Sequence, residues 1–380
     1  MKKNLIIFGT RPEAIKMAPL IKEFQKRDQF QTKVCVTAQH REMLDQVLDF
    51  FEITPDYDLN LMKPNQNLYS LTSDIITGLQ PILEEYKPDY VYVHGDTTTT
   101  MAASIASFYA GAKVCHVEAG LRTNNKKSPF PEEMNRQIAG RVADYHFVPT
   151  ENSEQNLRKE NIKENSIVIT GNTVIDALLF SSKRVQNFEN SEILELKKII
   201  DTEKKIILIT GHRRENHGLG FINICEALKE VALNNKNVQI IYPVHLNPNI
   251  KGPVYELLSG IENIKLVSPL SYPAFVWLMK NAYLIITDSG GIQEEAPSLR
   301  KPVLVMRDTT ERPEAVDSGT VILVGTDKQK IVKETNILLE NTEKYSLMSE
   351  LHNPYGDGKA SERIVDFIAK ETDGKIYNSY

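Results

Sequence analysis

The sequence predicts an α/β protein made of two Rossmann-like domains, each with a doubly wound parallel sheet, facing each other across a cleft. Short apolar, β-branched runs alternate with amphipathic stretches of helix length, and this alternation stops at a polar stretch and then restarts. The residues with the most suggestive chemistry directly follow the apolar runs. Because ligands of such open sheets bind beyond the carboxyl ends of the strands, we expect both domains to contribute to one site.

The apolar runs give the expected strands in chain order. In the first half they lie at 4–8, 33–37, 90–94, 113–117, 145–149 and 166–170. Amphipathic stretches such as APLIKEFQKR and REMLDQVLDFF lie between them and predict the covering helices. After a polar stretch around 181–190, further runs lie at 205–210, 238–244, 264–269, 283–287, 302–306 and 320–324. The halves share an architecture and not a repeated sequence.

Composition excludes several classes of function. The chain has 380 residues, of which 41% are hydrophobic and 25% charged, as is ordinary for a globular protein of two domains. A net charge of −5 gives no footprint for nucleic acid or an anionic membrane, so we expect a small-molecule ligand. The 3 cysteines lie far apart without a CxxC, which predicts reduced core residues. The apolar stretch at 5–8 is too short for a signal peptide or membrane span, so a cytoplasmic location is expected.

The segment YLIITDSGGIQEEAP at 283–297 predicts a strand, a turn that could cradle a phosphate, and a helix start. Its two glycines let the backbone approach a ligand, and the helix that follows directs unpaired N–H groups at it. Glu294 and Glu295 could accept hydrogen bonds from ribose hydroxyls. A helix start capped by Asp288 or Ser289 explains the segment equally well, so both interpretations stay open.

The GTRPE motif at 9–13 follows the first expected strand. Thr10 and Glu13 have the spacing of a capping box, which makes much of the motif structural. Neither capping nor core packing explains Arg11, whose guanidinium fork suits a diphosphate. Lys16 lies about one turn further along and could add positive charge, although a solvated lysine is the default interpretation.

Carboxylates follow two neighbouring expected strands. Asp96 follows the run at 90–94 and Glu118 follows the next, so they should converge as acid or base groups, although Asp96 could simply cap a helix. The stretch SPFPEEMNR brings Glu132 and Glu133 to a helix start, which is either functional or a solvated helix face.

In the second half of the chain, the segment GHRREN at 211–216 follows an expected buried strand. Its density of ionic side chains there indicates a functional role. Other motifs are missing from the sequence. It has no GxGxxG, no GxxxxGK[ST], no H-x-x-x-H and no carboxylate triplet, so no dinucleotide, ATP or metal is indicated.

Taken together, a long ordered set of segments resembles the non-hydrolysing UDP-N-acetylglucosamine 2-epimerases. The segments are GTRPEAIKMAP, TAQHREMLD, VHGDTTTT, HVEAGLRT, SPFPEEMNRQ, TGHRREN, YPVHLNPN, TDSGGIQEEAPSL and RDTTERPEA. The resemblance covers nearly the whole chain. The resemblance implies a GT-B fold with domains at 1–170, completed by a final helix at about 358–380, and at 171–357. It also implies a homodimer, no cofactor, and interconversion of UDP-N-acetylglucosamine and UDP-N-acetylmannosamine through 2-acetamidoglucal, supplying precursors of cell-surface polysaccharides.

The resemblance further implies roles for the residues that match the family's motifs. The catalytic set is Asp96, Glu118, Glu132 and His212, and which carboxylate takes the C2 proton stays open. The UDP-binding set is Arg11, Lys16, Leu270, Tyr272, Phe275, Ser289, Gly290, Gly291 and Glu295, with uracil resting against the loop after Ser268 and Arg11 reaching the diphosphate from the other domain.

Some family members bind a second UDP-N-acetylglucosamine as an activator beside the active site. The matching positions here are Gln39, Glu132, Arg213 and His245. Two positions depart, because Glu42 and Asn65 stand where activator-dependent members can carry glutamine and arginine. A carboxylate replaces a neutral amide and a cation next to a diphosphate is lost, so we expect weaker activation than in those members.

Rival functions remain at this point. The chain could epimerise a related UDP-2-acetamido sugar, such as a uronic or diacetamido one, which a sugar screen would decide. The same fold also serves glycosyltransferases, which consume UDP-sugar only with an acceptor, and a catalytically dead copy could be a nucleotide-sugar sensor. The intact set of catalytic matches argues against the dead copy.

Overall fold

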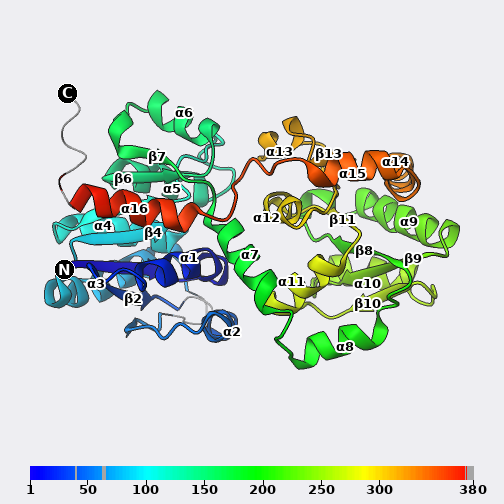
Figure 1. Cartoon of the computed structure of the whole chain (residues 1–380), viewed down its shortest axis with the longest axis horizontal. Coiled ribbons are helices and arrows are strands. Elements are labelled where there is room, and N and C mark those ends of the chain that lie inside the picture. The colour runs from blue at the N-terminus through cyan, green and yellow to red at the C-terminus, as the bar shows by residue number, and fades with distance from the viewer. Residues whose placement is uncertain (39–40, 62–65, 373, 375–380) are drawn as a thin grey trace. The chain divides into compact units, whose positions relative to one another are not determined.

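The computed structural model describes residues 1–38, 41–61, 66–372 and 374, and its chain divides into two compact units (Figure 1). Unit 1 comprises Met1–Ala177 and Tyr355–Tyr380, and unit 2 comprises Leu178–Pro354. The boundaries that the sequence predicts lie at 170/171 and 357/358. Unit 2 is therefore one continuous stretch of chain, whereas unit 1 is assembled from two.

Unit 1 is built on a 7-stranded sheet with the order β3-β2-β1-β4-β5-β6-β7, in which each described pairing is parallel. The strands are β1 Lys2–Phe8, β2 Phe30–Val36, β3 Tyr57–Asp58, β4 Tyr90–His94, β5 Lys113–Val117, β6 Tyr145–Val148 and β7 Ile167–Ile169. The helices are α1 Arg11–Phe24, α2 Arg41–Phe51, α3 Leu68–Tyr86, α4 Thr98–Tyr109, α5 Glu132–Val142, α6 Glu151–Lys159, the 3-10 turn η1 Glu164–Ser166, and α16 Ala360–Thr372. Helix α7, Thr173–Arg184, carries the chain out of unit 1.

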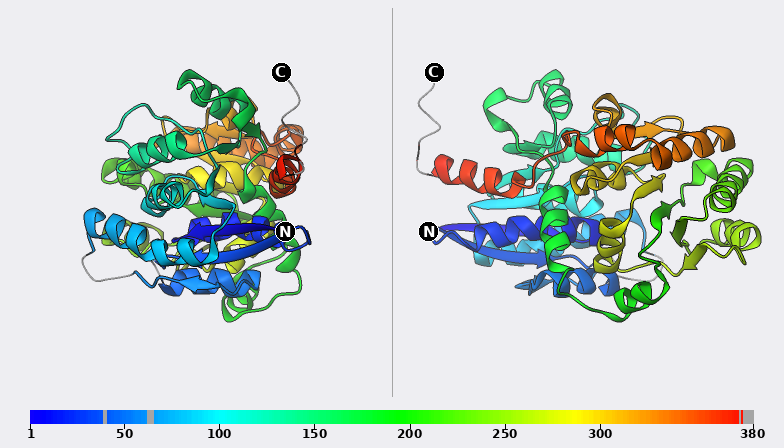
Figure 2. Two further views of the ribbon diagram at one scale, coloured as in Figure 1. Left: turned by 90° about the vertical axis from the view of Figure 1, so that its left-hand side faces the viewer. Right: turned by 45° about the vertical axis from the view of Figure 1, so that its right-hand side comes forward.

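The C-terminal helix α16 completes unit 1, where it packs beside α1 (red in Figures 1 and 2). Its Phe367 ring meets those of Tyr145 and Phe147 edge-on, with centroids 5.3 and 5.7 Å apart. Its buried Glu371 accepts hydrogen bonds from Tyr145 Oη at 2.8 Å, from Lys113 Nζ at 2.6 Å and from the hydroxyl of Tyr90. These three residues begin β6, β5 and β4, so α16 is fastened to the amino ends of the central strands.

Unit 2 is built on a 6-stranded sheet with the order β10-β9-β8-β11-β12-β13, again parallel throughout the described pairings. The strands are β8 Lys205–Thr210, β9 Val238–Pro243, β10 Ile264–Val267, β11 Leu284–Thr287, β12 Val303–Val305 and β13 Val321–Leu323. The helices are α8 Ser191–Ile199, α9 Leu219–Asn234, α10 Pro248–Leu258, α11 Tyr272–Asn281, α12 Gly290–Glu295, α13 Pro313–Asp317, α14 Lys328–Glu340 and α15 Thr342–Glu350, with 3-10 turns η2 Arg214–Asn216 and η3 Ala296–Leu299.

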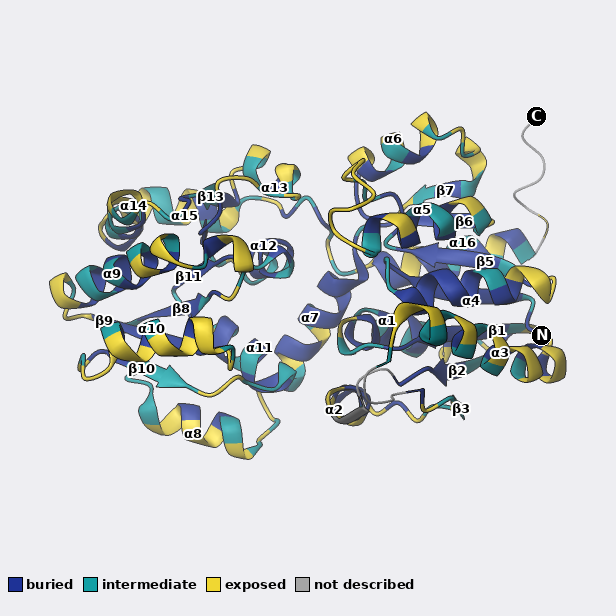
Figure 3. Ribbon diagram, turned by 180° about the vertical axis from the view of Figure 1, so that it is seen from behind, coloured by how far each residue is buried: buried dark blue, intermediate teal, exposed yellow. Residues whose placement is uncertain are grey.

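The predicted class of two parallel-sheet α/β domains is confirmed, and each expected apolar run coincides with an observed strand to within a few residues. The central strands are buried, whereas edge strand β10 is half-buried and helices such as α8 show an exposed face (Figure 3). Strand β3 was not expected. It has only two residues, Tyr57 and Asp58, and no apolar run, so tertiary pairing with β2 creates it.

Strand order reverses at one point in each sheet, and the reversal fixes where ligands can enter. In unit 1 the chain winds one way from β1 to β3 and the other way from β4 to β7. In unit 2 the corresponding neighbours are β8 and β11. Several of the residues singled out by sequence directly follow these strands at their carboxyl ends, namely Arg11, Asp96, His212 and the glycine pair at 290–291.

Candidate active site

Glu13 joins the loops that follow β1 and β4, the two strands between which the strand order of unit 1 reverses. The predicted capping box is present, with Thr10 N donating to Glu13 Oε2 at 2.8 Å. The same oxygen accepts from Gly9 N at 3.1 Å, and Oε1 accepts from Thr97 Oγ1 at 2.7 Å. Burial raises the pKa of this carboxyl group, and the four donors around it favour its charged form. Glu13 is therefore a brace between the β1–α1 and β4–α4 loops.

Glu118 follows β5 in a left-handed conformation, with φ at 60°. Its Oε2 accepts from Lys16 Nζ at 2.5 Å and from Asn172 Nδ2 at 2.8 Å. The Nε2 atom of His94 lies 3.7 Å from the same oxygen. Burial lowers the pKa of His94 to about 4, so its ring is neutral at pH 7 and Lys16 is the cation beside the carboxylate.

Asp96 lies between the end of β4 and the start of α4. Its Oδ2 accepts from Nη2 of Arg136, and its backbone carbonyl accepts from Asn135 Nδ2 at 3.0 Å. Both partners come from α5, which also begins with Glu132. Helix α5 thus carries Glu132 and also holds Asp96 in place.

Glu132 and Glu133 have different surroundings. Glu133 is fully buried and accepts from the backbone N–H groups of Thr123 and Asn124 at 3.0 and 3.1 Å, and from Arg136. It is therefore structural. Glu132 has a buried Oε2 that has no hydrogen-bond partner in the part of the chain that the structure describes. A buried carboxylate oxygen without a partner suits contact with a ligand.

Arg11 is the first residue of α1, and its guanidinium is half-buried. Burial lowers its pKa, and among residues 1–38, 41–61, 66–372 and 374 it forms no ion pair. Lys16, by contrast, is committed to Glu118. The interpretation of both as diphosphate ligands stays a prediction.

In unit 2, the turn between β11 and α12 contains Ser289, Gly290 and Gly291. Ser289 is the N-cap residue but makes no side-chain cap hydrogen bond. Asp288 does not cap either: its Oδ2 accepts from the backbone N–H groups of His212 and Arg213, each at 2.8 Å. Buried Asp288 thus ties the β8 and β11 loops together and leaves the start of α12 uncapped by these two side chains.

Two guanidinium groups approach the glycine turn. A Cβ atom placed on Gly290 would lie 3.7 Å from Arg213 Nη2 and 3.9 Å from Arg312 Cζ. Arg213 Nε donates to the carbonyl of Asp288 at 2.9 Å, and Arg312 pairs with the buried carboxylate of Glu294. The turn therefore presents glycine backbone beside fixed cations, an arrangement suited to a diphosphate. Glu295 is half-buried at the end of α12.

His212 lies directly beside this turn. Its Nδ1 is 3.7 Å from Asp288 Oδ1, and its ring stacks on that of His245 with centroids 5.4 Å apart and an interplanar angle of 14°. Burial lowers the pKa of His212, and the nearby Asp288 carboxylate opposes that shift. His245 Nδ1 accepts from Asn247 N at 3.1 Å, which orients the stack.

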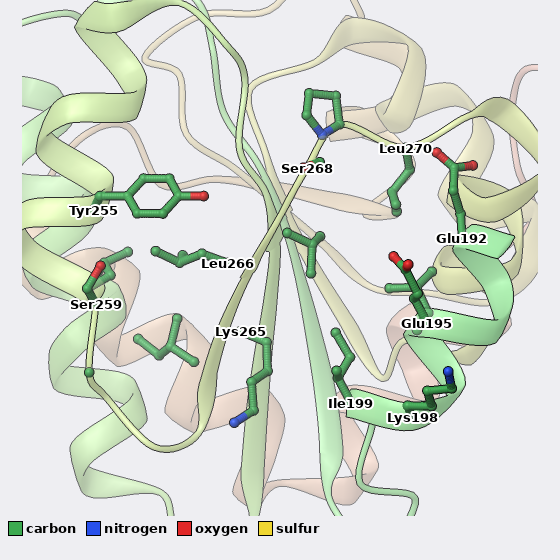
Figure 4. A pocket seen from close by; sticks show the side chains of 16 residues that line it. Glu192, Glu195, Lys198, Ile199, Tyr255, Ser259, Lys265, Leu266, Ser268 and Leu270 are labelled. Atoms are coloured by element: carbon green, nitrogen blue, oxygen red, sulfur yellow. The ribbon is translucent and has the colours of Figure 1, made fainter.

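The residues expected to hold uracil lie at the start of α11. Phe275 and Tyr272 are half-buried on that helix, and burial raises the pKa of the tyrosine. Leu270 lies in the preceding loop and lines a pocket of about 570 Å³ that runs along edge strand β10 between α8 and α10 (Figure 4). None of the ionic residues of the glycine turn lines this pocket.

The predicted site residues fall into two sets, one in each unit. Unit 1 brings Glu118 and Lys16 into contact and places Asp96 and Glu132 at neighbouring loops, and unit 2 gathers His212, Arg213, His245 and the glycine turn. Gln39, Asn65 and the side chain of Glu42 lie outside the described residues.

Sequence reasoning missed three partners of these residues: Arg136, Asn172 and Arg312. Arg136 ends the quoted motif SPFPEEMNR, and Asn172 follows a glycine at the end of a strand, as do many functional residues. Arg312 lies in RDTTERPEA, which was quoted without a role. A search of every strand end for donors would have found Asn172.

Within the described residues, no group of three or more His, Cys, Asp and Glu side chains is arranged to hold a metal ion. The helices that the structure describes include none with the length and apolar character needed to cross a bilayer.

Comparison with known proteins identifies the family. A family model described as UDP-N-acetylglucosamine 2-epimerase matches residues 22–369. The UDP-N-acetylglucosamine 2-epimerase of Escherichia coli K12 is 59% identical over 368 residues, which cover 96% of this chain and 98% of that protein.

Solved structures agree with this match. The crystal structure of the Neisseria meningitidis UDP-GlcNAc 2-epimerase bound to UDP-GlcNAc is 52% identical, with a TM-score of 0.88, and covers 97% of this chain and 100% of that one. A Methanocaldococcus jannaschii UDP-GlcNAc 2-epimerase in complex with UDP-GlcNAc and UDP is 34% identical, with a TM-score of 0.78, covering 97% and 99%. Matches of this length and identity show that the chain belongs to the UDP-N-acetylglucosamine 2-epimerase family.

Proposed function

We propose that this protein interconverts UDP-N-acetylglucosamine and UDP-N-acetylmannosamine by eliminating UDP and adding it back. The observation that carries the proposal is the set of strand-end carboxylates in unit 1, in a chain of the epimerase family. The carboxylate of Glu118 accepts from Lys16 and Asn172. Asp96 accepts from Arg136 at its carboxylate and from Asn135 at its backbone carbonyl, so both acidic residues have a defined geometry.

The chemistry of epimerisation at C2 explains why carboxylates and a diphosphate site are needed together. The C2 hydrogen is not next to a carbonyl, so its direct removal would form a carbanion of prohibitive energy. If the bond between C1 and the UDP oxygen breaks as a base takes the C2 proton, the electron pair forms the C1–C2 double bond of 2-acetamidoglucal. UDP departs with the electrons of the broken bond. Return of UDP to C1 with protonation of the opposite face of C2 gives the epimer, and no electrons are gained or lost.

The two units supply the two kinds of group that this reaction needs. Asp96, Glu118 and Glu132 provide acids and bases for C2, where a positioned group contributes about 10²- to 10⁴-fold in rate. Arg213, His212 and the glycine turn provide cations and N–H groups for a departing diphosphate. Arg11 and Lys16 add positive charge in unit 1.

The rest of the assignment extends the same proposal. Glu295 accepts from the ribose, and uracil packs on Leu270, Tyr272 and Phe275. Gln39, Glu42, Arg213 and His245 form a weak activator site. The protein acts without a cofactor as a cytoplasmic homodimer, and its product serves cell-surface polysaccharide synthesis.

Proton NMR of UDP-N-acetylglucosamine with the purified protein in D₂O, without cofactor, tests the proposal. We expect UDP-N-acetylmannosamine with deuterium at C2. No new sugar signal would refute the proposal. Repeating the experiment with uronic and diacetamido UDP-sugars, and then with acceptor sugars, would show whether a related epimerase or a glycosyltransferase replaces it.

A further inference from the structure

Two segments of chain cross each other where the polypeptide leaves and re-enters unit 1. Asn172, just before α7, donates its backbone N–H to the carbonyl of Tyr355 at 2.7 Å. Gly171 has φ at +86°, and a Cβ atom on it would lie 3.3 Å from the Cα of Gly356. The two segments therefore pack backbone to backbone, with no room for a side chain between them.

The side chain of Asn172 is buried at this crossing, and both ends of its amide are used. Its Oδ1 accepts from Val174 N at 3.0 Å, in the first turn of α7. Its Nδ2 donates to Glu118 Oε2 at 2.8 Å. Because one end must accept and the other must donate, the amide has one orientation and the Glu118 contact is fixed by the backbone of α7.

Glu118 is thereby held from two sides. The charged and titratable groups that face it include Lys16 from α1 and His94 from the end of β4, and the charge of Asp96 acts on the same histidine. Lys16 is a flexible point charge, whereas Asn172 is anchored by three hydrogen bonds besides the one to Glu118: its N–H donates to Tyr355 O, its carbonyl accepts from Ile175 N, and its Oδ1 accepts from Val174 N. With Oε2 bound to both donors, Oε1 lies on the side of Gly95, whose added Cβ would be 3.6 Å away.

We propose that Asn172 is a positioning residue for proton transfer at Glu118, and that it fixes this carboxylate to the crossing of the two chain segments. The inference rests on the proposed function, in which Glu118 is an acid or base. The amide stabilises the charged carboxylate and sets its angle toward C2.

Asn172→Asp separates the two contacts of the side chain. Aspartate keeps an acceptor for Val174 N and keeps the backbone contact, but it places a second carboxylate against Glu118. Asn172→Ala removes both contacts and measures their sum. Asp176→Asn is the matched control, because Asp176 also lies on α7 and accepts from Ala360 N and Ser361 N at 3.2 and 2.8 Å, without touching Glu118.

We expect Asn172→Asp to lower kcat about 10²-fold, since a misplaced catalytic group costs about this much, with UDP affinity measured by calorimetry within about twofold of wild type. The acid limb of the kcat/KM profile should move up by about one pH unit or more, because the charged form of Glu118 loses a donor and gains a like charge. Asp176→Asn should lower Tm and leave the acid limb in place. Wild-type kcat and an unmoved limb in Asn172→Asp would overturn the inference.

A readout that needs no turnover separates this inference from the proposed function. The carboxylate stretch of Glu118 can be titrated by infrared difference between each protein and its Glu118→Gln variant. A higher titration midpoint in Asn172→Asp and Asn172→Ala supports the positioning role, even if the wild type fails to epimerise UDP-N-acetylglucosamine. An unchanged midpoint in both variants refutes it, even in an active epimerase.

Discussion

In both units a buried carboxylate joins the two loops where strand order reverses, but the charged residues beside that carboxylate differ between the units. In unit 1, buried Glu13 lies in the first turn of α1, directly after the β1 loop, and accepts from Thr97 in the β4 loop. In unit 2, buried Asp288 comes from the β11 loop and binds the β8 loop through two backbone N–H groups. One carboxylate therefore joins the two central loops of each unit. In unit 1 it follows the first central strand in the chain, β1, and in unit 2 it follows the second, β11.

Beyond that brace the units diverge. In unit 1, the carboxylates that we propose as acids or bases are Asp96 and Glu118, and each forms an ion pair with a cation of the same unit, Arg136 or Lys16. In unit 2, the groups that we propose to face the diphosphate are Arg213, Arg312 and the glycine backbone, and each arginine forms an ion pair with a carboxylate. The difference teaches that the fold fixes where a site lies, while the sign of the charge facing the ligand is chosen separately in each unit.

The largest effect should come from the unit 1 carboxylates. Asp96→Asn or Glu118→Gln should lower kcat about 10²- to 10⁴-fold, the usual worth of a general acid or base, while UDP still binds. Turnover in D₂O by NMR and UDP calorimetry measure the two quantities. Near-normal turnover in either variant would remove that residue from the mechanism, and lost UDP binding would show that the division between the units is wrong.

The buried pair in unit 2 should dominate local stability. Arg312→Met leaves the carboxylate of Glu294 buried without its cation, which should cost about 3 kcal/mol in free energy of unfolding. Denaturant unfolding measures this cost, and adding Glu294→Gln should recover part of it. The exposed pair of Arg158 and Glu164 in unit 1 is the control, since Arg158→Met should change nothing measurable. Equal effects at both pairs would contradict the expectation.

Acid should destabilise unit 1 before unit 2. Burial lowers the pKa of His94 to about 4 and of His116 to about 3, whereas both titrate near 6.5 in the unfolded chain. Below pH 6.5 the unfolded state binds more protons, so stability falls as pH drops toward 4, by on the order of 2 kcal/mol per histidine at pH 5. Hydrogen exchange at pH 7 and pH 5 should show protection lost in unit 1 first. Earlier loss in unit 2, whose His212 is half-exposed, would reverse the comparison.

The smallest effect should come from the glycine turn. Gly290→Ala places its methyl group at ordinary contact distances, 3.7 Å or more, so the fold should tolerate it. The methyl group should hinder approach of a diphosphate and raise the Kd for UDP about tenfold. Calorimetry with UDP measures this change. Gly252→Ala on α10 is the control, because nothing lies within 4 Å of its added Cβ. An unchanged Kd for UDP in Gly290→Ala would show that the diphosphate does not bind at the glycine turn.

The fold was largely predictable because buried parallel strands are written as continuous apolar runs. Strand β4, YVYVH, was predicted to the residue, and the Thr10–Glu13 capping box was readable from its spacing. Contacts between residues that are far apart in the sequence could not be predicted. Lys16 and Glu118 are 102 residues apart, and Asn172 reaches Glu118 only because β7 lies two strands from β5 in the sheet. A local sequence pattern predicts where a strand ends, but the order of strands in the sheet determines which strand ends lie next to one another.

The fastening of α16 has a consequence for how the protein is made. Glu371 accepts from the first residues of β4, β5 and β6, so these strands are synthesised well before the helix that covers their amino ends. Unit 2, a single continuous stretch, can close as soon as it has been synthesised. In vectorial synthesis the domain begun first is therefore finished last, and until then its α16-binding surface is exposed to chaperones.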